Sequence, residues 1–123
     1  MKTILAIGSG SFIGGISRYL LSQLVQSRGI TAFPLATFSV NIIGCFLIGI
    51  VFAFGERSSI SPELRLFLAT GILGGFTTFS AFSYETFGLL RNGQFMVAST
   101  YIIGSVLFGV LATWTGYSLF KLS

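Results

Sequence analysis

The chain has 123 residues, of which 53% are hydrophobic and only 8% are charged. A water-soluble globular surface needs more charge than this, so the composition predicts an integral membrane protein with one domain, residues 1–123. The net charge of +4 comes from basic residues that lie mostly near the ends of apolar segments, which is typical of membrane flanks and argues against a nucleic-acid partner.

The chemistry open to the chain is narrow, because it contains no His and a single cysteine, Cys45, inside an apolar run. A disulfide framework, a Cys/His metal site and a Ser-His-Asp triad are therefore excluded within one chain. No phosphate-binding loop and no nucleophile paired with a base is visible, so the sequence does not predict an enzyme.

Four segments reach the roughly 20 apolar residues that a membrane-spanning helix requires. They cover about residues 3–26, 35–54, 62–90 and 95–120. These spans predict an all-α, multi-pass fold in a lipid bilayer, with both chain termini on the same side.

Basic residues near the span ends mark the orientation of this fold only weakly. The side with the termini carries Lys2, Arg57, Arg65 and Lys121, and the opposite side carries Arg28 and Arg91. Because orientation follows the difference in Lys and Arg between the two sides, so small a bias leaves insertion in both directions open.

The first span combines small residues with one charge. Gly10 and Gly14 form a GxxxG pair, which allows two helix backbones to approach closely. Arg18 lies within the span but near its end, where it could extend to the interface, fix a helix end or attract anions at a vestibule. The residues alone favour the structural or interfacial role.

The second span carries Asn41, the most polar side chain in the middle of any span. An amide in hydrocarbon needs hydrogen-bond partners. For a lone Asn, the usual partner is a neighbouring helix. The alternative is that its NH2 group faces a permeating anion.

The third span contains the stretch G-I-L-G-G-F-T-T-F-S-A-F-S, from Gly71 to Ser83, where a plain membrane helix would carry Leu, Ile and Val. Non-helical backbone at membrane depth occurs only where protein or a water-lined cavity satisfies its polar groups. A helix broken at the midplane is a recurrent way to build an ion site. The alternative is a tightly packed but continuous helix.

Phenylalanines recur at every third position of this stretch, at Phe76, Phe79 and Phe82, and would share roughly one helical face. Ring edges carry partial positive charge, so a ring met edge-on attracts an anion without a full cation to trap it. Hydroxyl donors interleave with the rings at Thr77, Thr78, Ser80 and Ser83. Glu85 follows within a turn and is expected near the far interface, which argues against a proton-relay carboxylate.

The fourth span has one small, polar face. Tyr101, Ser105, Gly109 and Thr113 follow one another at steps of four residues. This face could pack closely on another helix or line a narrow polar track.

Together these features favour a passage for a small anion, because donors without counter-charge bind an anion adequately but not tightly. Four helices are too few to enclose a pore and still pack, so an oligomer, most simply a dimer, is expected. Two alternatives stay open. One is a proton-coupled multidrug or cation exporter, although the first span lacks Asp and Glu. The other is a membrane scaffold that transports nothing.

The motifs resemble those of the Fluc (CrcB) family of small fluoride channels. They are S-V-N-I-I-G in the second span, G-G-F-T-T-F-S-A-F-S-Y-E in the third and G-x-x-x-R-Y in the first. The resemblance covers essentially the whole chain. It implies an antiparallel, dual-topology homodimer with two pores, which exports fluoride passively through the inner (plasma) membrane of a bacterium.

The resemblance also implies a role for each matching position in the anion pathway. Phe79 and Phe82 would be the ring-edge pair facing the fluoride ion, and Asn41 its amide donor. A polar track would include Ser80, Ser83, Tyr101, Ser105 and Thr113. Arg18 and Glu85 would lie near the vestibules.

A structural cation is implied by the same resemblance. The third helix would break near Gly74 to Thr77. Backbone carbonyls of Gly74 and Thr77 from both subunits would then hold a Na+ ion at the dimer axis.

One position departs from the family pattern, which commonly reads F-S-T-F-S. Here Ala81 stands between Ser80 and Phe82. A missing hydroxyl at this point predicts an intact fold and dimer, but a slower passage of fluoride than in relatives.

Overall fold

The structure, a computed structural model, describes residues 1–28, 33–57 and 60–121. In chain order its elements are α1 (Lys2–Gln26), α2 (Leu35–Glu56), α3 (Pro62–Arg65), the π-helical segment η1 (Leu66–Leu73), α4 (Gly74–Phe76), α5 (Phe79–Arg91) and α6 (Phe95–Lys121). Within these ranges there is no strand. In the described part of the chain, four helical segments, the third of them running from Pro62 to Arg91, are long and apolar enough to cross a membrane. The predicted all-α membrane fold is therefore confirmed.

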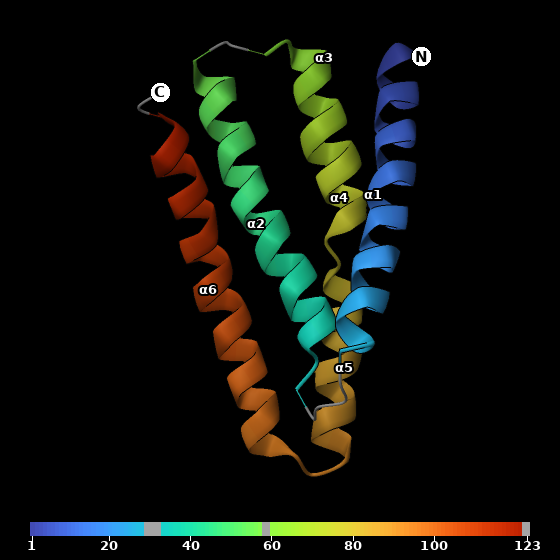
Figure 1. Ribbon diagram of the computed structural model, residues 1–123, viewed down its shortest axis with the longest axis vertical. Helices are drawn as coiled ribbons and strands as arrows, with labels where there is room; N and C mark the ends of the chain where they lie inside the picture. The colour runs from blue at the N-terminus through green and yellow to red at the C-terminus, as the bar shows by residue number, and fades with distance from the viewer. Residues whose placement is uncertain (29–32, 58–59, 122–123) are drawn as a thin grey trace.

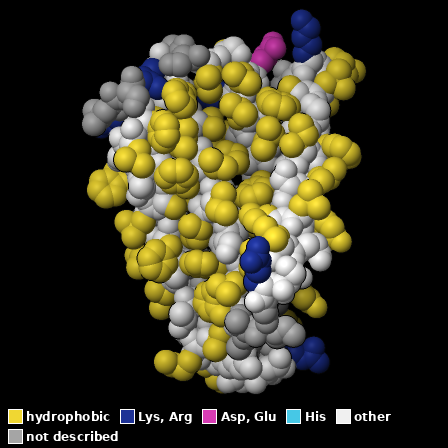
Figure 2. Space-filling model, viewed as in Figure 1, with side chains coloured by type: hydrophobic (Ala, Val, Ile, Leu, Met, Phe, Trp, Pro, Cys, Tyr) yellow, Lys and Arg dark blue, Asp and Glu magenta, His cyan; other side chains and the backbone are white. Residues whose placement is uncertain are grey.

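The spans are arranged as two packed pairs (Figure 1). The helix α2 lies along α6, and α1 lies along η1 and α4. The start of α1 and the end of α6 lie at the same end of the bundle, opposite the connection from α5 to α6 (Figure 1). Hydrophobic side chains cover much of the visible face, with basic side chains mainly toward its two ends (Figure 2). This distribution is that of a protein surrounded by lipid.

The α2–α6 pair depends on glycine at its points of closest approach. A Cβ atom at Gly49 would overlap the backbone carbonyl of Thr113, and one at Gly116 would overlap that of Phe46. The Thr113 hydroxyl also donates to the Cys45 carbonyl at 2.9 Å. Small residues thus bring the two backbones into contact, as is common between membrane helices.

The predicted GxxxG pair of α1 packs in the same way against the third span. A Cβ atom at Gly10 would lie 2.7 Å from the Phe67 carbonyl oxygen, and one at Gly14 would overlap the Ile72 carbonyl. In return, a Cβ atom at Gly75 would lie 2.7 Å from the Ser11 carbonyl oxygen. Glycines on both elements therefore hold α1 against the part of the third span that precedes its interruption.

The third span is built from several pieces. The Ser61 side chain accepts a hydrogen bond from the Leu64 N–H at 3.1 Å and caps its start, as Ser–Pro–Glu at a helix start predicts. Between α4 and α5, Thr77 and Thr78 have extended backbones, with ψ angles of 157° and 116°. The non-helical residues thus lie in the middle of the Gly71–Ser83 stretch that the sequence singled out.

This interruption changes the expected row of aromatic side chains. Phe76 ends α4 and is 8% exposed, whereas Phe79 begins α5 and is 79% exposed. The expectation that both share one helical face with Phe82 is wrong for Phe76, because two extended residues separate it from the next helix. Only Phe79 and Phe82 remain on a common helix.

We predict that Gly49→Ala lowers the free energy of unfolding in detergent by about 1–3 kcal/mol, because the added methyl group forces α2 away from α6. The matched control is Gly8→Ala in α1, where a Cβ atom meets nothing within 4 Å. Thermal or denaturant unfolding of both variants measures the difference. Equal stabilities would contradict the close approach of α2 and α6.

Candidate functional site

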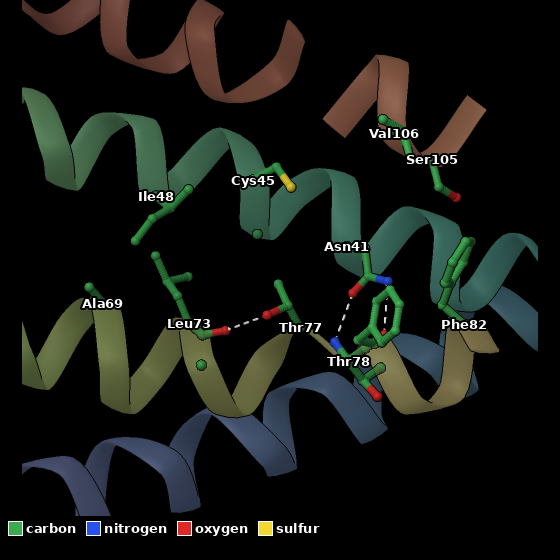
Figure 3. Close-up of a pocket in the computed structure, with 13 residues that line it drawn as sticks. Asn41, Cys45, Ile48, Ala69, Leu73, Thr77, Thr78, Phe82, Ser105 and Val106 are labelled. Carbon is green, nitrogen blue, oxygen red and sulfur yellow. Dashed lines mark hydrogen bonds between the residues drawn. The ribbon is translucent and has the colours of Figure 1, made fainter. Parts of the chain in front are cut away.

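An open groove of about 400 Å³ lies beside the interruption, between α2, the third span and α6 (Figure 3). Its lining includes an amide, hydroxyls, aromatic rings and exposed backbone, contributed among others by Asn41, Gly74, Thr77, Phe79, Phe82 and Ser105. Most of the lining is apolar, and the polar groups are few and convergent. Such a mixture is typical of a binding site for a small ligand.

Asn41 forms the contact that ties α2 to the interruption (Figure 3). Its Oδ1 accepts from the Thr78 N–H at 2.8 Å, and its Nδ2 donates to the Thr78 carbonyl at 3.1 Å. The side chain therefore pairs with the backbone of one residue as a neighbouring strand would. The sequence left two roles open for Asn41, a hydrogen bond to a neighbouring helical segment and contact with an anion, and the structure shows a hydrogen bond of the first kind. The second N–H of the amide takes no part in this pair.

Thr78 also caps the helix that follows. Its Oγ1 accepts from the Ala81 N–H at 3.2 Å, in the manner of an N-cap threonine. The Ser80 hydroxyl lies 3.3 Å from the same oxygen. Two N–H groups at the interruption are thus bound by side-chain oxygens: that of Thr78 by Asn41 from α2, and that of Ala81 by Thr78 itself.

Arg18 reaches the interruption from α1. Its Nε donates to the Gly75 carbonyl at 3.1 Å, and the side chain is half-buried. Gly75 lies in α4, the last helical piece before the extended residues. A cation near a helix C-terminus is favourable, so this contact fits the helix-end role among those considered for Arg18.

The aromatic rings form a row from the open side of the groove into the bundle. The Phe79 and Phe82 centroids lie 5.5 Å apart, and those of Phe82 and Tyr101 lie 4.9 Å apart. Phe79 is 79% exposed, whereas Tyr101 is fully buried. The Phe79 ring is therefore only partly enclosed by its own chain.

Glu85 takes part in a cluster that the sequence analysis missed. Its Oε1 accepts from the Tyr101 hydroxyl and its Oε2 from the Thr37 hydroxyl, each at 2.7 Å. The carboxylate thus lies between α2, α5 and α6 and is half-buried. No spacing in the sequence joins these three residues, because each comes from a different helix.

The remaining predicted residues divide between the groove and other surfaces. Ser105 lines the groove. Ser80 and Ser83 are exposed on α5. Thr113 donates to the Cys45 and Gly109 carbonyls, so its hydroxyl is engaged at the α2–α6 contact.

A metal site made of side chains does not occur in residues 1–28, 33–57 and 60–121, where no group of three or more His, Cys, Asp and Glu residues forms. Backbone oxygens are the remaining possibility. The carbonyls of Gly74 and Thr77 belong to residues that line the groove. A Cβ atom at Gly74 would meet only the Ala69 carbonyl oxygen, at 3.6 Å, so there is room beside this residue. Carbonyl oxygens in open space suit a hard cation.

Comparison with known proteins gives consistent matches over nearly the full length. A family model described as "CrcB-like protein, Camphor Resistance (CrcB)" matches residues 5–117. A protein of Flavobacterium psychrophilum named "Fluoride-specific ion channel FluC" is 47% identical over 98% of both chains. A protein of the same name from Geotalea daltonii is 49% identical over 94% of both chains. Another, from Chlorobaculum tepidum, is 46% identical over 99% of this chain and 97% of the relative.

We predict that Arg18→Leu lowers the free energy of unfolding by about 1–3 kcal/mol, because it leaves the Gly75 carbonyl without its side-chain donor. Arg91→Leu is the matched control, because Arg91 is exposed at the end of α5. Denaturant unfolding in detergent measures both variants. If the two substitutions had the same effect, Arg18 would not stabilise the end of α4.

Proposed function

The chain belongs to the CrcB family, and from this membership and the groove we propose that it is a fluoride channel. It would let fluoride leave a bacterial cell through the inner membrane without coupling to another energy source. The relatives are named as ion channels, so the chain belongs to a family of channels and not of enzymes.

The observation that carries this proposal is the joint presence of aromatic rings and neutral donors along one groove. Phe79 and Phe82 lie side by side in it, and Ser105 of α6 also lines it. Asn41 retains one N–H beyond its pair with Thr78. A small anion would find several weak donors here, and no Lys or Arg side chain is among the described residues that line the groove, so it would be bound weakly enough to pass rapidly.

The rest of the polar pathway is proposed to lead away from the rings toward the cluster around Glu85. The row of Phe79, Phe82 and Tyr101 supports this direction. Ser80, Ser83 and Thr113 stay candidates for the same track, and Arg18 and Glu85 for its vestibules. Arg18 has further guanidinium N–H groups beyond the one that binds Gly75.

The working unit is proposed to be an antiparallel homodimer of two such single-domain chains, with two pores. The groove is open, and the ring of Phe79 at its edge is 79% exposed. A second copy would enclose the ring and complete the wall of the pore. The small charge bias between the two ends of the fold is compatible with insertion in both directions.

A structural Na+ at the dimer axis is part of the proposal. The carbonyls of Gly74 and Thr77 would bind it, and the two copies would supply four oxygens. Such a cation would offset part of the repulsion between anions in the two neighbouring pores.

The first test is passive anion efflux from liposomes that contain the purified protein, comparing fluoride with chloride. We expect rapid fluoride loss with little chloride loss. Phe79→Ile and Phe82→Ile should lower the fluoride rate by at least about tenfold, because an aliphatic side chain lacks the positive ring edge.

The matched control is Phe12→Ile, since Phe12 is 69% exposed on α1, which does not line the groove. Its fluoride rate should equal that of the unmodified chain. Absence of fluoride efflux from folded protein, both in the unmodified chain and after Ala81→Thr, would end the channel proposal and favour an exporter or a scaffold.

A second prediction concerns Ala81, whose N–H is held by the Thr78 hydroxyl at the start of α5. Ala81→Thr should raise the fluoride rate several-fold without changing the stability of the fold, because it restores a hydroxyl between the rings and the polar track. The same liposome assay measures it, with Ala81→Val as a control of similar volume. An equal rate for Thr and Ala at this position would contradict the missing-hydroxyl interpretation.

A further inference from the structure

We propose that Asn41 and Thr78 are positioning residues for the cation, because they bind the two N–H groups that would otherwise occupy the carbonyls of Gly74 and Thr77. The inference rests on the sodium site of the proposed function. It assigns both side chains a task that is separate from contact with the anion.

The argument begins with the register of an α-helix, in which each carbonyl accepts from the N–H four residues later. If the third span were continuous, the Gly74 carbonyl would accept from Thr78 and the Thr77 carbonyl from Ala81. In the structure, the Thr78 N–H donates to Asn41 Oδ1 at 2.8 Å, and the Ala81 N–H donates to Thr78 Oγ1 at 3.2 Å. Each of the two carbonyls has therefore lost its helical donor to a side-chain oxygen.

The side-chain donors at the interruption go to different carbonyls. Arg18 Nε donates to the Gly75 carbonyl, and Asn41 Nδ2 donates to the Thr78 carbonyl, each at 3.1 Å. Side-chain oxygens thus bind the helical donors of Gly74 and Thr77, whereas the side-chain donors bind the carbonyls of Gly75 and Thr78.

The backbone geometry keeps the diverted N–H groups from returning. Thr77 and Thr78 have extended φ and ψ angles of −84° and 157°, and of −149° and 116°. In this conformation a carbonyl no longer points along the axis toward the following turn. Without the two side-chain oxygens, a return to helical angles would regain two backbone hydrogen bonds and close both carbonyls.

The test uses the full-length protein in detergent and follows its melting temperature as sodium chloride replaces N-methyl-D-glucamine chloride at constant ionic strength. A ligand that binds the folded state raises the melting temperature with its concentration, so the curve has a half-maximal sodium concentration. We expect Thr78→Val to raise this concentration roughly five- to tenfold, the size of one competing hydrogen bond. Thr78→Ser, which keeps the hydroxyl, should restore the original value.

Asn41→Leu should shift the half-maximal concentration in the same direction, and it serves as an independent variant if Thr78→Val fails to fold. The matched control is Thr115→Val, because the Thr115 hydroxyl donates to the Leu111 carbonyl within its own helix, α6, away from the interruption. The melting temperature without sodium reports any purely structural loss, so it is separated from the sodium dependence.

Two results would overturn the inference, and they differ in what they say about the proposed function. If the unmodified chain responds to sodium and Thr78→Val responds at the same concentration, the positioning role is wrong and the cation site stands. If the unmodified chain does not respond to sodium, the cation site itself is wrong and the inference falls with it.

Discussion

The constraint on which this structure depends is that a backbone interrupted at membrane depth must find partners for its polar groups. Thr77 and Thr78 leave the helix in the third of four membrane-spanning segments, where water is not freely available. Arg18 from α1 and Asn41 from α2 supply hydrogen bonds to this backbone. The interruption is therefore stabilised from both flanking helices and is not merely a flexible point in the span.

The glycine contacts follow from this requirement. An arginine on α1 can reach the Gly75 carbonyl only if the two backbones lie close together, and Gly10 and Gly14 allow that approach. Larger residues at either position would separate α1 from the third span and carry Arg18 away from its acceptor. The close packing at the glycines thus determines whether the Arg18 side chain can reach the Gly75 carbonyl.

Much of the fold could be predicted from the sequence, because hydropathy and span length are local properties. The position of the interruption was also indicated, since glycines and hydroxyls replace aliphatic residues there. The contacts across helices could not be predicted in the same way. The cluster of Thr37, Glu85 and Tyr101 needs three helices in a particular rotation, and periodicity within one helix gives no information about that rotation. Likewise, the three-residue spacing predicted that Phe76 and Phe79 share one helical face. The extended residues between them instead leave Phe76 buried and Phe79 exposed.

The placement of Glu85 bears on how an anion could pass so close to a carboxylate. Both of its oxygens accept from hydroxyl groups, and hydrogen bonds of this kind spread and stabilise the negative charge. The same contacts orient the Tyr101 ring against Phe82, which lines the groove. The carboxylate therefore fixes the inner end of the aromatic row, while the hydroxyls that bind it limit its repulsion of an approaching anion. In this respect Glu85 resembles Asn41: each orders the groups around the proposed pathway through hydrogen bonds to another element of the bundle.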